Sequence, residues 1–407
     1  YVGAAKGLSQ WAGYAQFERP DVIPETKHPP GFPLLILPLL WAGLDQIPIL
    51  QMVTGMFGFA SLVLLSCYEG STGRLVAALT GLNFYWLLFC GHLLSEIPYC
   101  FMLLLLCRMV HHCAKRGEIT LNARVALAFT LGFSILLKTI GVIFVPLLLV
   151  VLWRKRLPIK EWILIPLYSA LFIAPYYFYS AVSGYRDDVA GYPGVIEVLK
   201  TNVPYWLEAL PFLMGVTSRL VDLTNPGDGV VALLLFSLIC WSVWTAFKEG
   251  LELEVLALLG FGAVLLVWPF QDPRLFVPTI PLLLLIVLRG GGLLFSNLGI
   301  PRPYYVAFAI LLAAEVLRIS GPLASALRST PPHSRPPVLG RLDELAGPGD
   351  VVVADDPGVW LQCKTPVFPL ASEERILKVY EAWMESMAMV DARFLLLAKD
   401  LDHGRSL

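Results

Sequence analysis

Long apolar runs separated by short polar connectors dominate the chain. A helix needs roughly 20 apolar residues to cross the hydrocarbon core of a membrane, and runs near that length recur from residue 46 onward. They predict about ten spans, at residues 46–68, 75–94, 97–113, 121–138, 140–153, 161–181, 230–247, 252–269, 274–289 and 303–320. We therefore expect an all-α polytopic membrane bundle.

The first 44 residues carry a different pattern. Residues 1–32 are polar and aromatic, and a short helix lying on the membrane surface is predicted by apolar residues at helical spacing, namely Tyr1, Ala5, Leu8, Trp11 and Ala12. Residues 33–44 are apolar but short, which indicates a juxtamembrane or half-inserted helix. The chain starts with neither a methionine nor a signal segment, so we expect a further span upstream of Tyr1.

Polar sequence returns after the proline-rich linker at residues 330–337. Helices near 338–346 and 372–388 and strands at 350–354 and 393–398 are predicted there, as in a small α/β region. The chain then divides into a membrane domain over residues 1–320, with outer loops 1–45 and 182–229, and an extracytoplasmic tail over residues 321–407.

The distribution of basic residues indicates which connectors lie on the cytoplasmic side of the membrane. Under strict alternation the most basic connectors fall on one side, which the positive-inside rule makes the cytoplasm; they hold Arg74, Arg108, Lys115, Arg116, Arg154, Lys155, Arg156, Lys160, Lys248, Arg289 and Arg302. The outer side then receives the corner Ser95–Glu96, Lys138, the loop 182–229, the corner 271–274 and the tail.

Composition supports this interpretation and excludes other partners. Hydrophobic residues make up 57% of the chain and charged residues 15%, against roughly 25% charged residues in a soluble domain. A net charge of −1 argues against nucleic acid as a partner. The seven cysteines show no disulfide or zinc spacing. We expect membrane lipid as a partner, no metal and no cofactor.

Candidate chemistry comes from charges at the outer edge of the membrane, where a charge is costly and is usually functional or paired. Glu96 stands between two apolar runs, where Pro98 is expected to break the helix; a solvated turn carboxylate is the alternative. Lys138 ends one span at the same level, and Arg274 opens another. Asp272 and Arg274 could also simply pair with each other.

A second group of candidates lies before the first proline pair. Pro29 and Pro30 bias the preceding residues toward extended geometry, so Lys27 and His28 are expected to form a stiff rim that can hold an anionic headgroup. The alternative is a stop signal with interfacial side chains. With Lys138 and Arg274, these residues would give several donors for a phosphate.

Other motifs carry weaker signals. His92 lies one helical turn before Glu96 and could orient it, although an interfacial histidine is the simpler interpretation. The acidic pairs at 187–188 and 355–356 are typical of solvated loops. The glycines at 290–292 lack the spacing of a nucleotide-binding loop and are expected to form a flexible turn.

Four short stretches in order carry a resemblance: Lys27-His28-Pro29-Pro30-Gly31-Phe32-Pro33-Leu34-Leu35, Leu94-Ser95-Glu96-Ile97-Pro98, Leu137-Lys138-Thr139-Ile140-Gly141 and Asp272-Pro273-Arg274-Leu275-Phe276-Val277-Pro278. From residue 1 to about residue 290 the chain resembles the integral-membrane glycosyltransferase C superfamily. It is similar to the branch of dolichyl-phosphate-mannose protein mannosyltransferases and the lipid A aminoarabinose transferase.

The resemblance implies transfer of a monosaccharide from a polyprenyl-phosphate donor to a protein, lipid or glycan acceptor on the outer side of the membrane. The family's principal acid lies in its first outer loop, at a position that would precede Tyr1; alternatively Asp21 or Glu25 takes that part. Glu96 would orient the acceptor, with Lys27, His28, Lys138 and Arg274 near the donor phosphate. A multi-pass protein of a bacterial inner membrane, with its site facing outward, is expected.

Two functions of other classes remain open at this stage. A transporter or flippase of a lipid-linked saccharide or small anion would use the same outer cations and the same membrane-depth acid. Transporters usually carry internal repeats, and the two halves of this sequence show no such duplication. A noncatalytic membrane scaffold would leave the charges at Lys27, Glu96 and Arg274 unexplained.

Overall fold

Helix α13 (Ile280–Asn297) forms the buried centre of the helical part of the chain. The computed structural model describes residues 1–10, 14–16, 23–24, 29–68, 70–182, 194–213, 225–268, 273–328, 351–354, 367–369 and 394–397. Every side chain from Ile280 to Leu288 is buried, as expected for a helix that is apolar all round. Helices α11 (Pro226–Lys248), α4 (Gly70–Leu82) and α12 (Glu252–Val267) pack against it.

The glycines at 290–292 lie inside α13, so the expected flexible turn is wrong. A Cβ atom on Gly290 would collide with Ser242 of α11, and one on Gly292 would collide with the ring of Tyr304 in α14 (Pro303–Arg328). The missing side chains let two helices approach the backbone of α13. Close packing, rather than conformational freedom, explains these two residues.

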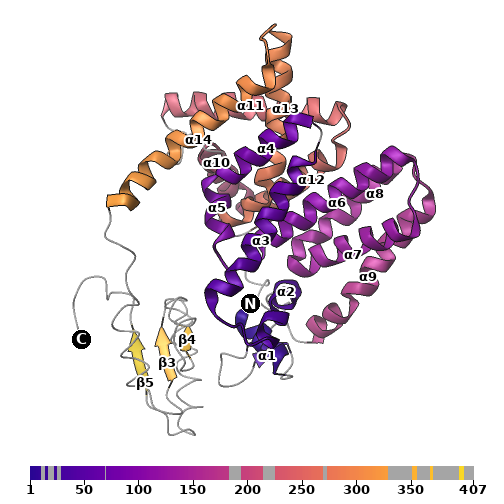
Figure 1. Ribbon diagram of the computed structural model, residues 1–407, viewed down its shortest axis with the longest axis vertical. Coiled ribbons are helices and arrows are strands. Elements are labelled where there is room, and N and C mark those ends of the chain that lie inside the picture. The colour runs from indigo at the N-terminus through magenta and orange to yellow at the C-terminus, as the bar shows by residue number, and fades with distance from the viewer. Residues whose placement is uncertain are drawn as a thin grey trace. The chain divides into compact units, whose positions relative to one another are not determined.

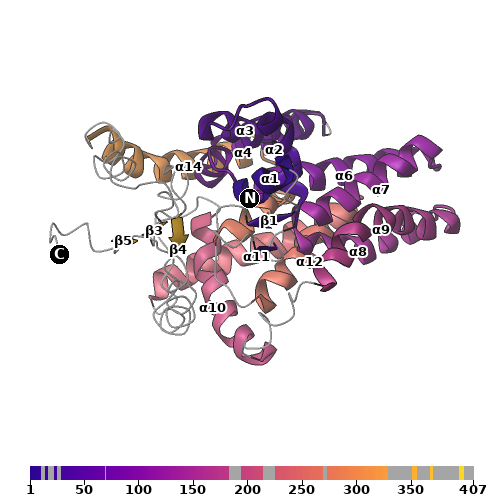
Figure 2. The same cartoon turned by 90° about the horizontal axis from the view of Figure 1, so that it is seen from below.

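Four helices form a neighbouring layer, visible side by side in Figure 1 and Figure 2. They are α6 (Glu96–Arg116), α7 (Leu121–Leu137), α8 (Phe144–Arg154) and α9 (Ile159–Val182). Arg124 of α7 donates two hydrogen bonds of 2.6 Å to the carboxylate of Glu161 in α9. Since that carboxylate is fully buried, the two-pronged ion pair fixes α7 against α9.

The predicted span 75–94 is broken. Helices α4 and α5 (Phe84–Cys90) meet at Asn83 with a bend of 69°. Asn83 caps α5 by accepting a hydrogen bond from the Trp86 amide at 3.2 Å. The Phe84 amide donates at 2.7 Å to the buried carboxylate of Glu315 in α14, so a second helix stabilises the break.

The span count of about ten is not confirmed. Five described helices are long and apolar enough to cross a membrane, and the bent pair makes six. They are Ile47–Ser66, Glu96–Arg116, Ile159–Phe178, Gly227–Lys248 and Arg274–Asn297. Three of the predicted spans coincide with apolar helices that are shorter, Leu121–Leu137, Thr139–Arg154 and Pro303–Val316, and these account for most of the difference.

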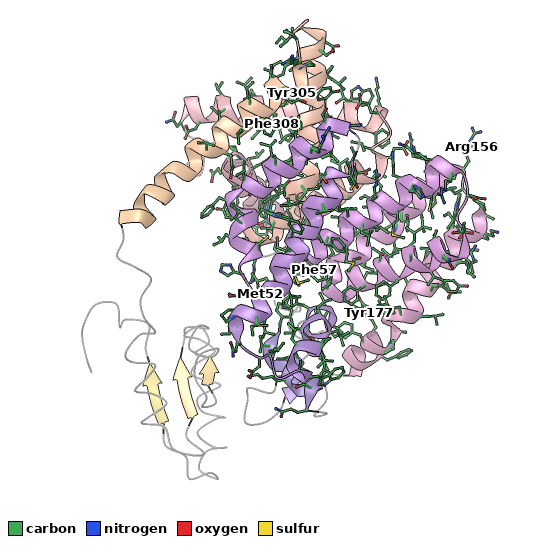
Figure 3. All side chains as sticks on the ribbon, viewed as in Figure 1. Met52, Phe57, Arg156, Tyr177, Tyr305 and Phe308 are labelled. Atoms are coloured by element: carbon green, nitrogen blue, oxygen red, sulfur yellow. The ribbon has the colours of Figure 1, made fainter. Side chains whose placement is uncertain are left out.

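Large apolar side chains lie on the outside of the bundle. Met52 of α3 (Ile47–Ser66) is 65% exposed and Tyr177 of α9 is 39% exposed, and both stand at the outer surface in Figure 3. Exposure of so many apolar side chains is unfavourable in water but suits contact with lipid tails. The protein is therefore an integral membrane protein.

A further helix, α10 (Val195–Leu213), lies within the expected outer loop 182–229. Its Asn202 donates to the carbonyl oxygens of Leu265, Leu266 and Trp268 at the end of α12, at 3.1, 3.1 and 2.6 Å. Trp206 donates to the Leu265 oxygen as well, at 3.2 Å. These bonds satisfy carbonyls that the end of α12 leaves open, and they hold α10 in place.

Contacts divide the chain into two units, of which residues 1 and 26–326 form the first. The second contains α1 (Val2–Ser9), the antiparallel pair β1 (Ala15–Gln16) and β2 (Ile23–Pro24), and the parallel sheet β4-β3-β5. Its strands are β3 (Val351–Ala354), β4 (Val367–Pro369) and β5 (Phe394–Leu397). Two of them coincide with the predicted strands 350–354 and 393–398, while the helices predicted at 338–346 and 372–388 lie outside the described residues.

Candidate functional site

Glu96 is the first residue of α6, and its side chain points into the protein. Ser95 precedes the helix as its cap residue, and Pro98 lies in the first turn. Pro98 does not break the helix as expected, because the amides of the first turn have no partner within a helix and a missing one costs little. Glu96 is 3% exposed, so the alternative of a solvated turn carboxylate is wrong.

Lys138 ends α7 in an extended conformation, with φ −148° and ψ 128°. The chain then turns through the short helix η1 (Thr139–Ile143) before α8 begins. Gly141 permits this turn, since a Cβ atom there would lie 3.0 Å from the backbone of Ile135. The abrupt end of α7 leaves the Lys138 side chain at the same level as the start of α6.

Glu96 and Lys138 form a buried ion pair. The Lys138 Nζ lies 2.8 Å from Oε1 of Glu96, and the two side chains are 13% and 4% exposed, respectively. Oε2 of Glu96 is buried and has no hydrogen-bond partner among the described residues, and the same holds for the hydroxyl of Tyr99, one turn further along α6. Buried polar atoms are nearly always satisfied, so this turn of α6 offers two buried atoms with which a hydroxyl group or a water molecule could form hydrogen bonds.

The first of the four stretches that carry the resemblance, described over residues 29–35, lies beside this pair. Gly31 starts α2 (Gly31–Trp41), and a Cβ atom on it would lie 2.5 Å from the Leu136 backbone near the end of α7. Phe32 contacts the ring of Tyr1 edge-on, with centroids 5.1 Å apart. The Tyr1 hydroxyl in turn shares a 3.0 Å hydrogen bond with Ser95 Oγ. Residues far apart in sequence therefore meet around the start of α6.

The fourth stretch, described from residue 273 to residue 278, also reaches this end of the bundle. Helix η2 (Pro273–Thr279) packs against α6. Its Phe276 is buried against Trp206 of α10, with ring centroids 6.2 Å apart, and Arg274 is exposed. The described parts of all four stretches thus lie around the start of α6 and the end of α7.

His92 is placed differently. Its side chain is exposed, and Nδ1 donates to the carbonyl oxygen of Leu88 at 2.6 Å. The ring also lies 5.9 Å from that of Phe89. The remaining predicted site residues lie outside the described part of the chain: Asp21, Glu25, Lys27, His28 and Asp272.

The arrangement combines one buried carboxylate with one ammonium group. Within the described residues, no group of three or more His, Cys, Asp and Glu side chains suits a metal ion. Oε2 of Glu96 can accept a hydrogen bond from a hydroxyl group, and Lys138 has N–H groups beyond the one that it gives to Glu96. Glu96 can therefore bind a hydroxyl group, and Lys138 can bind an anionic group beside it.

Sequence reasoning did not assign a role to Tyr1, Ser95 or Tyr99. Tyr99 follows Glu96 by three residues, a spacing that puts both on one face of a helix, so this signal was present in the sequence. The contact between Tyr1 and Ser95 joins residues 94 positions apart, and no local pattern predicts it.

Comparison with known proteins gives a likeness at the level of fold. No family model matches the chain, and no curated protein matches it in sequence. Two solved structures match it in fold. ArnT from Cupriavidus metallidurans bound to undecaprenyl phosphate has 14% identity and a TM-score of 0.53, and the match covers 96% of this chain and 84% of that chain. The same protein in the apo state has 13% identity and a TM-score of 0.52, with 96% and 85% of the two chains covered. The chain therefore has an ArnT-like fold, which supports the resemblance to the integral-membrane glycosyltransferase C superfamily.

Proposed function

We propose that the protein is a membrane glycosyltransferase that moves a monosaccharide from a polyprenyl-phosphate donor to an acceptor on the outer side of the membrane. The chain has the fold of ArnT, and the structure of ArnT has been solved with undecaprenyl phosphate bound. This likeness supports a polyprenyl-phosphate donor. On this proposal residues 1–320 form the transferase domain and residues 321–407 an extracytoplasmic tail. The sugar and the acceptor are set by pocket shape.

The observation that carries the proposal is the buried pair of Glu96 and Lys138 with one carboxylate oxygen left over. A charge pair is expensive to bury, and a bundle that needed only stability would do as well with apolar residues there. An acidic side chain at membrane depth is typical of a functional site, and one oxygen of Glu96 has no hydrogen-bond partner among the described residues.

The chemistry follows from the two groups. Sugar transfer needs an acceptor that loses a proton and a leaving phosphate whose growing charge is stabilised. Oε2 of Glu96 would accept the hydrogen bond of the acceptor hydroxyl and orient it. Lys138 would contribute a free N–H to the leaving phosphate, together with Arg274, Lys27 and His28. Asp21 or Glu25 would take the acceptor's proton where no upstream acid does.

Transfer of radiolabelled sugar by the purified protein in lipid nanodiscs, from a panel of polyprenyl-phosphate sugars, tests this function. The Glu96→Gln variant keeps the shape and the hydrogen bond to Lys138 but removes the charge, so we expect transfer to be lost while the protein stays folded. Glu118→Gln is the matched control, because Glu118 is exposed beyond the other end of the same helix. Full transfer by Glu96→Gln would remove Glu96 from the site.

The second candidate function, a flippase or transporter, predicts a different result. The same preparation in liposomes would then move a fluorescent lipid-linked saccharide across the bilayer and would transfer no sugar from any donor. The buried acid favours this function as much as it favours catalysis. The ArnT-like fold favours transfer.

A further inference from the structure

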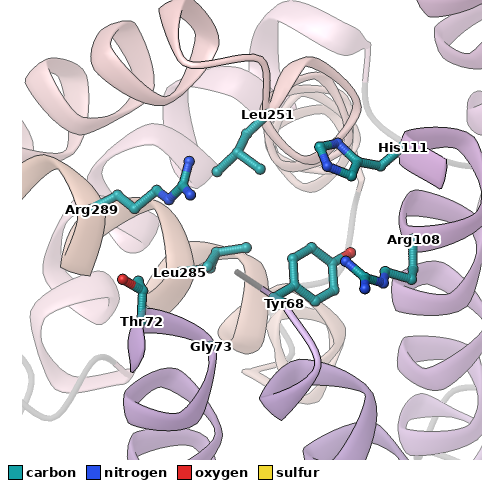
Figure 4. Close-up of a pocket in the computed structure, with 8 residues that line it drawn as sticks. All are labelled: Tyr68, Thr72, Gly73, Arg108, His111, Leu251, Leu285 and Arg289. Atoms are coloured by element: carbon teal, nitrogen blue, oxygen red, sulfur yellow. The ribbon is translucent and has the colours of Figure 1, made fainter. Parts of the chain in front are cut away.

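A cleft lies at the opposite end of the bundle from Glu96. Arg108 follows Glu96 by 12 residues along α6, a rise of about 18 Å. Helices α4, α6 and α13 and the segment before α12 form the cleft, which is lined by Tyr68, Thr72, Gly73, Arg108, His111, Leu251, Leu285 and Arg289 (Figure 4). This is the end where the basic connectors gather, the side predicted to be cytoplasmic.

Cations stand on both sides of the cleft. Figure 4 shows Arg289 and Thr72 on one side and Arg108 and His111 on the other. Arg289 is bonded to Glu249 at 3.1 Å. Arg108 lies over the ring of Tyr68, 5.6 Å from its centroid, and no carboxylate of the described residues lies within ion-pair distance of it. Arg108 therefore forms no ion pair with a carboxylate of the described residues.

The side chains that form the floor of the cleft are uncharged. Leu251 and Leu285 are buried, and so is Tyr68, whose hydroxyl donates to the Leu104 oxygen at 3.3 Å. Burial, and after it the nearby charge of Glu254, raises the pKa of Tyr68 well above its usual value. The phenol therefore keeps its proton and stays neutral at physiological pH.

We propose that this cleft binds the phosphate of an anionic lipid headgroup, at the opposite side of the membrane from the transfer site. Guanidinium groups match phosphate oxygens with two parallel hydrogen bonds, and basic pockets between membrane helices recognise such headgroups. Thr72 can donate its hydroxyl from the first turn of α4. The free space is about that of one water molecule, so the phosphate is held at the mouth, between the long side chains, and the acyl chains stay in the membrane.

Binding of defined phosphate compounds to the full protein in a neutral detergent tests the site. The probes are dioctanoyl phosphatidylglycerol, dioctanoyl phosphatidylcholine and inorganic phosphate at constant ionic strength, measured by isothermal titration calorimetry. Loss of a charge-assisted hydrogen bond in Arg108→Gln is expected to weaken binding of the anionic lipid about tenfold. Arg116→Gln is the matched control, since it removes the same charge from an exposed position two turns further along α6, and affinity there is expected to stay within about twofold.

Each outcome decides the matter. If phosphatidylglycerol alone binds, and only Arg108→Gln weakens that binding, the ligand is a lipid headgroup. If inorganic phosphate binds with equal affinity and shows the same response to the two variants, the cleft binds free phosphate instead. Equal affinity for the two lipids, or equal losses in Arg108→Gln and Arg116→Gln, would overturn the proposal. Arg108→Lys, which keeps the charge but loses the planar fork, gives a second test should Arg108→Gln unfold; it is expected to bind the anionic lipid less well than the parent and to fail the proposal if it binds equally.

Discussion

The two ends of α6 carry opposite chemistry. At its start the acid Glu96 is 3% exposed and is balanced by Lys138, whereas near its other end Arg108 is half-buried and no described carboxylate balances it. The placement of Glu96 suits the helix dipole, which favours an acid in the first turn of a helix, whereas Arg108 lies two turns before the last residue of α6, beyond the reach of that effect. Burial makes the difference. A buried carboxylate is costly without a cationic partner, whereas a cation that water can reach is stable without one and stays available to a ligand.

The largest expected effect separates these two ends. Glu96→Gln is expected to lower sugar transfer by about 10²-fold, because a misplaced acceptor hydroxyl slows the reaction by about that much, and to leave headgroup binding unchanged. Arg108→Gln is expected to do the reverse, weakening the headgroup without a comparable loss of transfer. Parallel transfer and calorimetric measurements on both variants give the comparison. Loss of both activities in either variant would mean that the two ends act as one site.

The second expected effect concerns the cost of an unpaired charge. Lys138→Met leaves the Glu96 carboxylate buried without its cation, which is expected to destabilise the protein by about 3–5 kcal/mol. Thermal unfolding of the purified variant measures this. Adding Glu96→Gln to Lys138→Met is expected to restore most of the stability. A single variant as stable as the parent would show that water reaches Glu96 and that the pair is not buried.

The sequence predicted each charged residue of this pair but not the pairing. Glu96 and Lys138 were expected at the outer level because each ends an apolar run. Their contact depends on how α6 packs against α7 and on the turn that Gly141 permits, and neither leaves a local pattern. Roles were therefore expected for each residue separately, with Glu96 on the acceptor and Lys138 on the phosphate.

The helices show the same limit. Apolar runs located α3, α6 and α9 within a few residues, because length and composition alone fix such spans. The bend at Asn83 was missed although Asn is a favoured cap residue, since its partner Glu315 is distant in sequence. The end of α13 was placed at 289 instead of 297 because close packing of Gly290 and Gly292 on neighbouring helices has no signature in one sequence.

A third prediction addresses the packing of α2 against the end of α7. Gly31→Ala is expected to destabilise the protein by about 1–3 kcal/mol, because its Cβ atom would lie 2.5 Å from the backbone of Leu136, which cannot yield as a side chain can. The shift of α7 would also displace Lys138 and lower transfer. Gly262→Ala in α12 is the control, since a Cβ atom there meets nothing within 4 Å. It is expected to be neutral or stabilising, as alanine is in a helix, so equal unfolding temperatures for the two variants would rule out close packing at Gly31.

The smallest expected effect is that of the hydrogen bond between Tyr1 and Ser95. The two hydroxyl groups lie 3.0 Å apart and are only partly buried, so removing the bond is expected to cost about 0.5–1.5 kcal/mol. Tyr1→Phe, Ser95→Ala and the double variant form a cycle whose coupling energy isolates this contact.

Because Ser95 immediately precedes Glu96, the contact also influences the direction in which the carboxylate points. We expect each single variant to lower transfer a few-fold at unchanged headgroup binding, and the double variant to lower it no further than either single one. Additive losses of transfer would show that Tyr1 and Ser95 act independently. Tyr1 would then influence the start of α6 through its ring contact with Phe32 rather than through this hydrogen bond.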